Sequence, residues 1–237
     1  KIARALHSVV AAGLLSTALV TTAVGASKSE KFLADAERFL EKGEIKSAVI
    51  QLKNSLQADP MNVEARLLLG NTSLRLGDGA AAEKELLRAK QLGAEPGRWI
   101  IGLGKALAMQ SKYYEILDEV QVDERLSSAD RAKVLAMRGH AQLALKQVDE
   151  AVTSYDGALQ LDPESPDARL GKVRVLIIKR QMDLARKEVD QLVQQHPDLA
   201  EAKVVRGELA RQAGELDLAF NDFSQAIDLA STNRRAY

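Results

Sequence analysis

The sequence predicts an all-α fold, an α-solenoid of about six helix–turn–helix units that follows an N-terminal signal peptide. Composition is the first reason: 46% of the 237 residues are hydrophobic and only 4% are aromatic. A chain rich in Ala, Leu, Glu, Lys and Gln favours helix over strand. The second reason is a small residue that recurs about every 34 positions. The third is a glycine that in several copies stands five residues before it, where one helix can end and the next begin.

The first 26 residues form a segment of their own, because they contain no acidic residue. Lys1 and Arg4 make a short positive region, an uncharged stretch follows, and Val24-Gly25-Ala26 provides the small residues that a signal peptidase reads. This layout predicts that residues 1–26 are a signal peptide, and that the protein is periplasmic or envelope-associated. The alternative is an uncleaved membrane anchor, although the stretch is short of the roughly 20 strongly apolar residues that a transmembrane helix needs.

The rest of the chain repeats with a period of 34 residues. The residues that mark the repeat are Ala48, Ala82, Ile116, Ala151, Ala185 and Ala219. They define six units, which span residues 29–62, 63–96, 97–131, 132–165, 166–199 and 200–233, and residues 234–237 match the start of a further, truncated unit. One helical pair cannot bury its own apolar face, so the units must stack into a solenoid.

The third unit departs from the pattern. Ile116 and Asp123 stand where other units have alanine, and the unit is one residue longer. We therefore expect a local distortion here, with Trp99, Tyr113 and Tyr114 packing at the distorted junction.

The stretch LRLGDGAAAEKELL (residues 74–87) brackets Asp78 with Gly77 and Gly79. A glycine-rich turn that opens a helix can cradle phosphate. A P-loop, however, also requires a preceding strand and a following Lys-Ser/Thr pair, which this stretch lacks. The period instead predicts a turn between the two helices of the second unit, in which Gly77 ends one helix and Asp78 or Gly79 begins the next.

Several classes of chemistry are excluded or unsupported. The chain has no cysteine, which excludes disulfides and thiolate sites, and its 33 basic and 33 acidic residues cancel, which argues against a nucleic-acid partner. His7, His140 and His196 lie far apart in the sequence, and no catalytic motif is present. We read Gly102 and Gly104 as a helix-packing pair. We predict no enzyme activity, no cofactor and no metal site.

Two copies carry a family resemblance. ALKQVDEAVTSYDGALQLDP and FLEKGEIKSAVIQLKNSLQADP resemble the tetratricopeptide repeat (TPR), and the resemblance covers residues 29–233. It implies a right-handed solenoid with the first helix of each unit on a concave groove that holds protein or peptide ligands.

A narrower resemblance covers residues 31–94 best. KFLADAERFLEKGEIKSAVIQLKNSLQADPMNVEARLLLG, followed by LRLGDGAAAEKELLRAKQLGA, is similar to TPR proteins of the PEP-CTERM/exosortase system (PrsT type). This implies a bacterial envelope protein that serves exopolysaccharide assembly or export, or protein sorting. Members are often lipoproteins, and Ser27 stands here where their lipidated cysteine would be.

The TPR register predicts which side chains line the groove. The candidates, two from each of five units, are Leu67, Asn71, Ile101, Lys105, Met137, His140, Arg174, Ile178, Glu208 and Arg211. They mix apolar side chains with charges of both signs, which suits a protein ligand better than a polyanion. The positions that grip a C-terminal carboxylate in chaperone-binding TPRs begin here with Leu33 and Glu37, so that role is not supported.

The sequence therefore predicts a non-catalytic scaffold for protein–protein interaction. One alternative is the substrate-adaptor region of a longer enzyme whose catalytic domain lies beyond residue 237, and another is a structural spacer without a specific ligand. At the C-terminal end, Phe220, Phe223 and Ile227 would be partly uncovered. We expect that end to self-associate or to fray. Any membrane contact would be through an uncleaved N-terminus.

Overall fold

The computed structural model describes the backbone of residues 28–235 and the side chains of residues 28–231. Within that range it contains twelve helices and no strand, which confirms the predicted all-α fold. The first helix covers residues 28–41, and the others are α2 (Ile45–Ala58), α3 (Val63–Arg75), α4 (Gly79–Gln91), α5 (Pro96–Met109), α6 (Tyr113–Glu119), α7 (Ser128–Ala144), α8 (Val148–Leu161), α9 (Pro166–Ile178), α10 (Met182–Gln195), α11 (Ala200–Gln212) and α12 (Leu216–Arg235). The predicted signal peptide lies outside the described residues.

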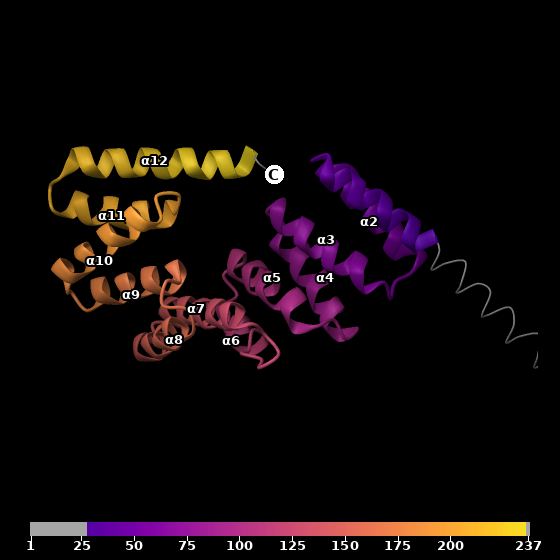
Figure 1. Ribbon diagram of the computed structural model, residues 1–237, viewed down its shortest axis with the longest axis horizontal. Coiled ribbons are helices and arrows are strands. Elements are labelled where there is room, and N and C mark those ends of the chain that lie inside the picture. The colour runs from indigo at the N-terminus through magenta and orange to yellow at the C-terminus, as the bar shows by residue number, and fades with distance from the viewer. Residues whose placement is uncertain (1–27, 236–237) are drawn as a thin grey trace, which may run out of the picture.

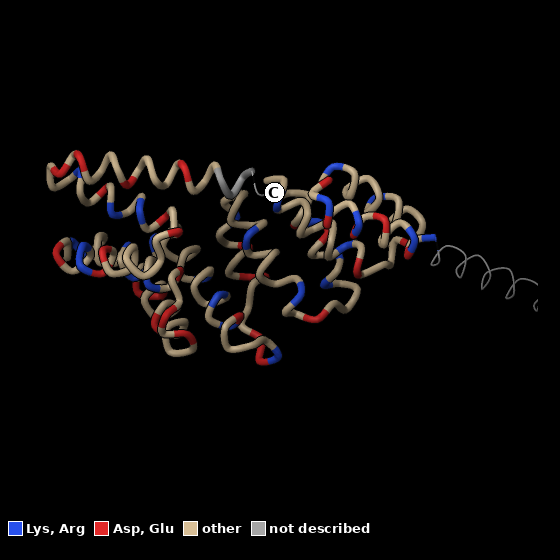
Figure 2. Tube along the Cα trace, turned by 45° about the horizontal axis from the view of Figure 1, so that its top comes forward, with Lys and Arg blue, Asp and Glu red and all other residues tan. Residues whose placement is uncertain are grey.

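The helices form hairpins that follow one another along a curve (Figure 1). The array begins with the indigo hairpin of residues 28–41 and α2, passes through α7 and α8, and ends with the yellow hairpin of α11 and α12. Within the described residues, every hairpin carries both basic and acidic residues (Figure 2). The arrangement is that of an α-solenoid, in which each hairpin packs mainly on its neighbours.

The six turns within the hairpins share one backbone conformation. Six residues, spaced 34 or 35 apart, have a positive φ of 57° to 81°: Gly43, Gly77, Ser111, Lys146, Arg180 and Gly214. In each turn the next N–H donates to a carbonyl five residues back, as Asp78 N does to Ser73 O at 2.9 Å. This is the six-to-one hydrogen bond of a helix C-terminus that ends on a left-handed residue. The 34-residue period is therefore present in the backbone geometry as well as in the sequence.

The stretch LRLGDGAAAEKELL forms the turn between α3 and α4, as the period predicts. Gly77 has φ +77°, and the Asp78 carboxylate accepts a hydrogen bond from Ala81 N at 2.9 Å, which caps the start of α4. A Cβ added to Gly79 would lie 2.9 Å from the Ala106 carbonyl, so glycine there lets α4 begin close against the end of α5.

Small residues let the helices approach, and larger residues fill the space between hairpins. Ala48, Ala82, Ala151 and Ala185 have no exposed surface. Four residues after the alanine that marks the repeat, three hairpins carry a large side chain that packs on glycines of the first helices. These contacts are Leu86 on Gly70, Tyr155 on Gly139 and Gly171, and Phe223 on Gly207. The repeated pattern of small and large residues thus sets how closely the two layers of helices pack.

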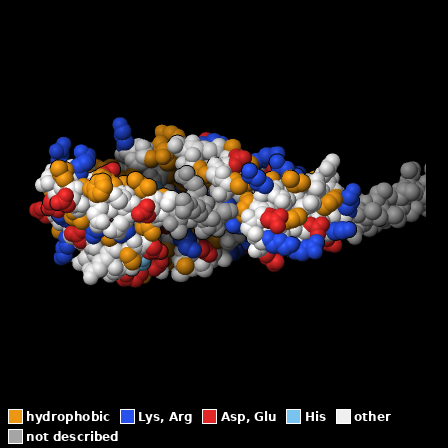
Figure 3. All heavy atoms as spheres, turned by 90° about the horizontal axis from the view of Figure 1, so that it is seen from above, with side chains coloured by type: hydrophobic (Ala, Val, Ile, Leu, Met, Phe, Trp, Pro, Cys, Tyr) orange, Lys and Arg blue, Asp and Glu red, His pale blue; other side chains and the backbone are white. Residues whose placement is uncertain are grey.

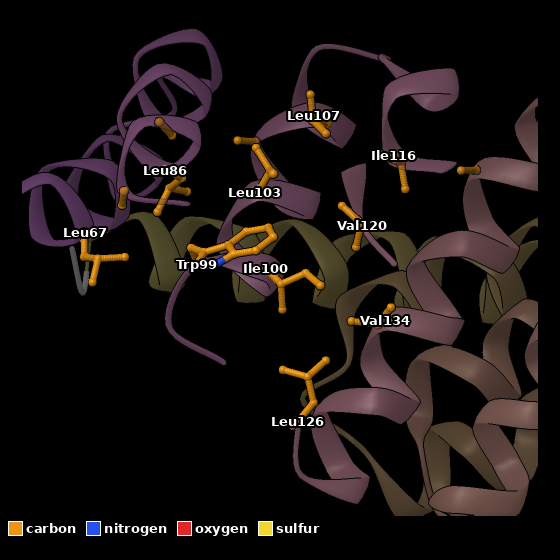
Figure 4. Close-up of a cluster of buried hydrophobic side chains, with 14 residues drawn as sticks. Leu67, Leu86, Trp99, Ile100, Leu103, Leu107, Ile116, Val120, Leu126 and Val134 are labelled. Atoms are coloured by element: carbon orange, nitrogen blue, oxygen red, sulfur yellow. The ribbon is translucent and has the colours of Figure 1, made fainter. Parts of the chain in front are cut away.

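The largest buried cluster lies around α5, where side chains from α4, α6 and α7 converge (Figure 4). Trp99 anchors it: its indole N–H donates to the Ala94 carbonyl at 3.1 Å, and the Lys90 ammonium lies 4.8 Å from the ring centroid. The cluster continues through Leu103 and Leu107 to Val134, so α4 to α7 share one core.

The expected distortion of the third unit is confirmed. α6 has seven residues, about half the length of α2, α4, α8 and α10, and the chain is not helical from Val120 to Ser127. Asp123 therefore lies outside any helix, where its carboxylate pairs with Arg125 at 2.7 Å. Tyr114, expected to pack at this junction, is instead exposed, because the short α6 buries only Ile116.

Candidate protein-binding groove

The ten groove candidates lie on the first helices of five successive hairpins, α3, α5, α7, α9 and α11. Each helix contributes two of them, three or four residues apart, which places both on one face of that helix. Asn71, Lys105, Ile178, Glu208 and Arg211 are exposed, and Ile101, Met137, His140 and Arg174 are half-buried. Leu67 differs from the others: it is only 2% exposed and belongs to the core around α5. The other nine residues therefore define the candidate groove.

The half-buried candidates connect one first helix to the next. Met137 on α7 packs over Gly104 of α5, where an added Cβ would lie 2.7 Å from its sulfur. His140 Nε2 donates to the Asp167 carbonyl at the start of α9 at 3.2 Å. The Arg174 guanidinium of α9 donates to the Glu201 carboxylate of α11 at 3.2 Å. These contacts link the first helices α5, α7, α9 and α11 in series.

His140 is the titratable group most affected by this packing. It lies edge-on to the Tyr155 ring, with the two centroids 5.5 Å apart. Burial lowers the pKa of His140, and the nearby Arg174 lowers it further, whereas Asp167 and Glu201 act in the opposite direction. The imidazole is therefore neutral at neutral pH, and Arg174 and Glu201 are the charged side chains beside it.

Three of the candidates are exposed charged residues. Lys105, Glu208 and Arg211 make no ion pair with any side chain in the part of the chain that the structure describes. Ile178 adds an exposed apolar side chain on α9, beside them along the array. A surface of this kind can contact a polypeptide that carries charges of both signs and an apolar side chain.

The sequence did not predict which residues of the next first helix contact the candidates His140 and Arg174. Glu201, which pairs with Arg174, stands in the first turn of α11, and Asp167 stands in the first turn of α9. An acidic residue at a helix start is visible in the sequence, but it is also the usual complement of the helix dipole. Only the spacing of the first helices shows that these residues reach the preceding helix.

A hollow between the fourth and fifth hairpins was not predicted either. It has a volume of about 590 Å³ and is bounded by side chains of α8, α9 and α10, among them Leu159, Lys172, Leu176 and Leu184. Lys172 pairs with Asp156 at 2.7 Å, which neutralises part of its rim. The hollow is lined by none of the groove candidates.

The described residues provide neither a metal site nor a membrane-spanning helix. No group of three or more His, Asp or Glu side chains is placed to hold a metal ion in residues 28–235. In the same part of the chain, no helix combines the length and the apolar character that crossing a membrane requires. The adjacent acidic residues Asp149 and Glu150 occupy the first turn of α8, and Gly102 and Gly104 lie within α5.

Comparison with known proteins supports one family. The model of the tetratricopeptide repeat matches residues 39–99 and 131–209, more than half of the chain. A comparison with proteins of curated function gives no match.

Solved structures share the fold at low sequence identity. A structure described as the functional characterization of Pseudomonas aeruginosa PilF is 21% identical, with a TM-score of 0.60, covering 90% of this chain and 93% of that one. A tetratricopeptide repeat protein from Parabacteroides merdae is 18% identical, with a TM-score of 0.66 and coverages of 89% and 87%. PilW, a widely conserved type IV pilus biogenesis factor, is 15% identical, with a TM-score of 0.59 and coverages of 83% and 91%.

Proposed function

Because the chain belongs to the tetratricopeptide repeat family, we propose that it is a non-catalytic scaffold that binds protein or peptide ligands in the groove of its first helices. One observation carries the proposal. The candidates stand on successive first helices of the array, and three exposed charged side chains among them, Lys105, Glu208 and Arg211, have no ion-pair partner in residues 28–231. An exposed charge without an ion-pair partner keeps its pairing capacity for a ligand.

The groove favours a particular kind of ligand. Lys105 is on α5, whereas Glu208 and Arg211 are on α11 with the exposed Ile178 on α9 between them. A polypeptide that lies across these helices would present an acidic side chain to Lys105, an apolar one to Ile178 and a charged pair to α11. The mixture of signs disfavours a polyanion such as nucleic acid.

We further propose that the scaffold works in the bacterial cell envelope, in exopolysaccharide assembly or export or in PEP-CTERM protein sorting. Two observations support this setting: the signal-peptide pattern of residues 1–26 and the similarity of residues 31–94 to TPR proteins of the exosortase system (PrsT type). The shared fold with PilW, a type IV pilus biogenesis factor, agrees with an envelope role.

Charge reversal in the groove tests the binding proposal. Ligands captured from an envelope extract are compared for the unchanged chain, for a Lys105→Glu/Arg211→Glu variant, and for a Lys53→Glu/Lys187→Glu variant. The last variant changes exposed lysines of α2 and α10, outside the groove, by the same charge. We expect specific ligands to be lost only from the groove variant. An identical set of ligands for all three chains would refute the groove assignment.

The envelope setting has its own test. The chain is expressed with a C-terminal alkaline phosphatase, which is active only outside the cytoplasm, and the N-terminus of the recovered protein is read by mass spectrometry. Cleavage after Ala26 and an active phosphatase are expected. A full-length, inactive fusion would overturn the envelope proposal and leave the binding proposal untouched.

A further inference from the structure

The hollow between the fourth and fifth hairpins is mainly apolar. Its lining includes Val152 and Leu159 of α8, Leu176 of α9 and Leu184 of α10, and Leu184 is 52% exposed. Its volume of about 590 Å³ falls in the range of small-molecule sites in proteins. Both hairpins that form it are followed or preceded by further described hairpins. The hollow is therefore a feature of the interior of the array and not of one of its ends.

Other junctions of the array show what this space can contain. At two of them, an ion pair joins the start of one second helix to the start of the next. The pairs are Glu83–Lys112, at 2.6 Å, between the second and third hairpins, and Arg186–Glu215 between the fifth and sixth. By the repeat, the same two positions of the hollow are Val152 and Gln181, which carry no charge. The side chains that bridge the space elsewhere are therefore missing here.

A second bridge is missing as well. Lys172 and Glu188 line the hollow at the positions that Arg206 and Asp222 hold one unit later. Arg206 and Asp222 form two hydrogen bonds, at 2.7 and 2.6 Å. The single ammonium of Lys172 instead pairs with Asp156 of α8 at 2.7 Å. The space that two ion pairs occupy in the next junction is thus left open between the fourth and fifth hairpins.

The missing side chains define the shape of a ligand that fits. A space that side chains fill elsewhere is about one side chain deep, which is too shallow for the body of a partner helix, about 10 to 12 Å across. The hollow extends along α9 from Arg169 to Lys179, a distance of roughly 15 Å at the rise of an α-helix. A narrow apolar space of this length suits an alkyl chain, because an alkyl chain has no polar group that would need a partner there.

The charged lining residues favour an anionic head group. Three of the four are basic, namely Arg169, Lys172 and Lys179, and the fourth is Glu188. Arg169 and Lys172 each have a carboxylate partner. Lys179, the exposed C-cap of α9, forms no ion pair within residues 28–231. Glu188 stands at the position of Asp222 and so near Lys172, about two helical turns of α9 away from Lys179. The uncompensated positive charge therefore lies at one end of the hollow.

We propose that this hollow binds a long-chain fatty acid. Its carboxylate pairs with the Lys179 ammonium, and its alkyl chain lies along α9 over Leu176 toward Leu159. Removal of the alkyl chain from water drives binding, and the ion pair fixes which end of the chain lies at Lys179. None of the groove candidates lines the hollow, so this site is separate from the proposed protein-binding groove.

Calorimetric titration of the purified chain tests the ligand. Sodium dodecanoate is added at pH 7.5, below the concentration at which it forms micelles. We expect saturation at one dodecanoate per chain. Decanoate should bind about tenfold more weakly, because it buries two methylene groups fewer. Dodecyltrimethylammonium, which has the same alkyl chain and the opposite charge, should bind more weakly than dodecanoate. Absence of saturable dodecanoate binding, or equal affinity for the cationic amphiphile, would overturn the proposal.

Filling the hollow is the matched structural test. Val152→Arg/Gln181→Glu installs the ion pair of the next junction and should weaken dodecanoate binding at least about tenfold, because its side chains occupy the site. Gln160→Arg/Gln194→Glu adds the same two charges at exposed positions outside the hollow and should bind like the unchanged chain. Circular dichroism checks that both variants are folded. Unchanged binding by the folded, filled variant would refute the site.

The head-group contact has a milder variant. Lys179→Gln removes one exposed charge and should weaken dodecanoate binding by up to about fivefold. Lys187→Gln, at an exposed lysine of α10 that does not line the hollow, should leave the affinity unchanged. Equal affinities of these two variants would contradict the placement of the carboxylate. This comparison, together with the location of the bound chain, decides the proposal if the filled variant does not fold.

The bound chain must also be located, because hydrophobic side chains are exposed elsewhere on the array (Figure 3). Phe220 and Ile227 of α12, expected to be partly uncovered, are 74% and 68% exposed. In methyl NMR spectra of the unchanged chain, dodecanoate should shift the signals of Val152, Leu159 and Leu176 and leave that of Ile227 in place. Shifts at Ile227 without shifts in the hollow would show adsorption to exposed apolar surface and would overturn the assignment.

Discussion

The guanidinium of Arg206 on α11 holds the carboxylate of Asp222 on α12 with two hydrogen bonds. Nε donates to Oδ2 at 2.7 Å and Nη2 donates to Oδ1 at 2.6 Å. The Asp222 side chain is fully buried and that of Arg206 mostly so, and Asp190 of α10 lies 3.8 Å from Nη1. The hydrogen bonds to Asp222 raise the pKa of Arg206, which keeps the guanidinium charged. Arg206 thus joins α11 to both α10 and α12.

Removing Asp222 should loosen the last hairpin. An Asp222→Ala variant leaves the Arg206 charge largely buried without its main partner, which costs roughly 3 kcal/mol. We would measure hydrogen exchange of the α11 and α12 amides, because it reports on the opening of this hairpin directly. Gln212→Ala, an exposed change in the same hairpin, should shift those rates by less than about 0.5 kcal/mol. Equal protection in both variants would show that the pair is not structural.

Glycine at position 146 should stabilise the fourth hairpin. Lys146 has φ +63°, a conformation that costs a residue with a Cβ roughly 1 to 2 kcal/mol relative to glycine. We expect Lys146→Gly to raise the free energy of unfolding by roughly 0.5 to 1 kcal/mol, the part left after the added freedom of the unfolded glycine. Lys146→Ala, which keeps the Cβ, should give no such gain, and urea titration followed by circular dichroism compares the three chains. A loss of stability in the glycine variant would contradict the strain argument.

The turns also show how much of the fold could be predicted from the sequence. Gly77 marks its turn by residue type, but Ser111, Lys146 and Arg180 adopt the same conformation without glycine, and only the 34-residue period points to them. The missing alanine at Asp123 correctly located the distorted unit. The burial of individual side chains was harder to predict. Leu67 shares a helix face with the exposed Asn71 yet is buried, because burial depends on how closely the next hairpin packs.

Removing the Tyr155 hydroxyl should not destabilise the protein. The ring is fully buried against Gly139 and Gly171, and the hydroxyl has no hydrogen-bond partner among the described residues. Burial strongly raises the pKa of this phenol, so it is neutral at all moderate pH. Because an unsatisfied buried hydroxyl costs about 1 kcal/mol or more, we expect Tyr155→Phe to be neutral or stabilising by up to about 1 kcal/mol in urea titration.

Phe223 is a precedent for that substitution within the chain, and Tyr155→Ala is its control. Phe223 occupies the equivalent position two units later and packs on Gly207 in the same way. Tyr155→Ala, which deletes the ring as well, should lose about 3 to 5 kcal/mol. If Tyr155→Phe lost more than about 1 kcal/mol, the hydroxyl would have to make a stabilising contact that the packing around it does not provide.

Acid should weaken the contact between the fourth and fifth hairpins through His140. Burial, and next the charge of Arg174, lower the pKa of His140 below its ordinary value of 6.5, so the unfolded chain binds this proton more readily than the folded one. The resulting stability is present above pH 6.5 and is lost as the pH falls below it toward the folded pKa. Protonation also adds a second positive charge beside Arg174 in the groove wall.

The measurement is the urea midpoint at pH 7.5, 6.5 and 5.5 for the unchanged chain, for His140→Gln and for His196→Gln. We expect His140→Gln to lower the midpoint at pH 7.5, because it disturbs the contact with the Asp167 carbonyl, but to flatten the fall toward pH 5.5. His196→Gln should keep that fall, because His140 is intact. If the His140 variant kept the full acid sensitivity, other groups would have to be responsible for it, and His140 could not serve as a proton-sensitive contact between the fourth and fifth hairpins.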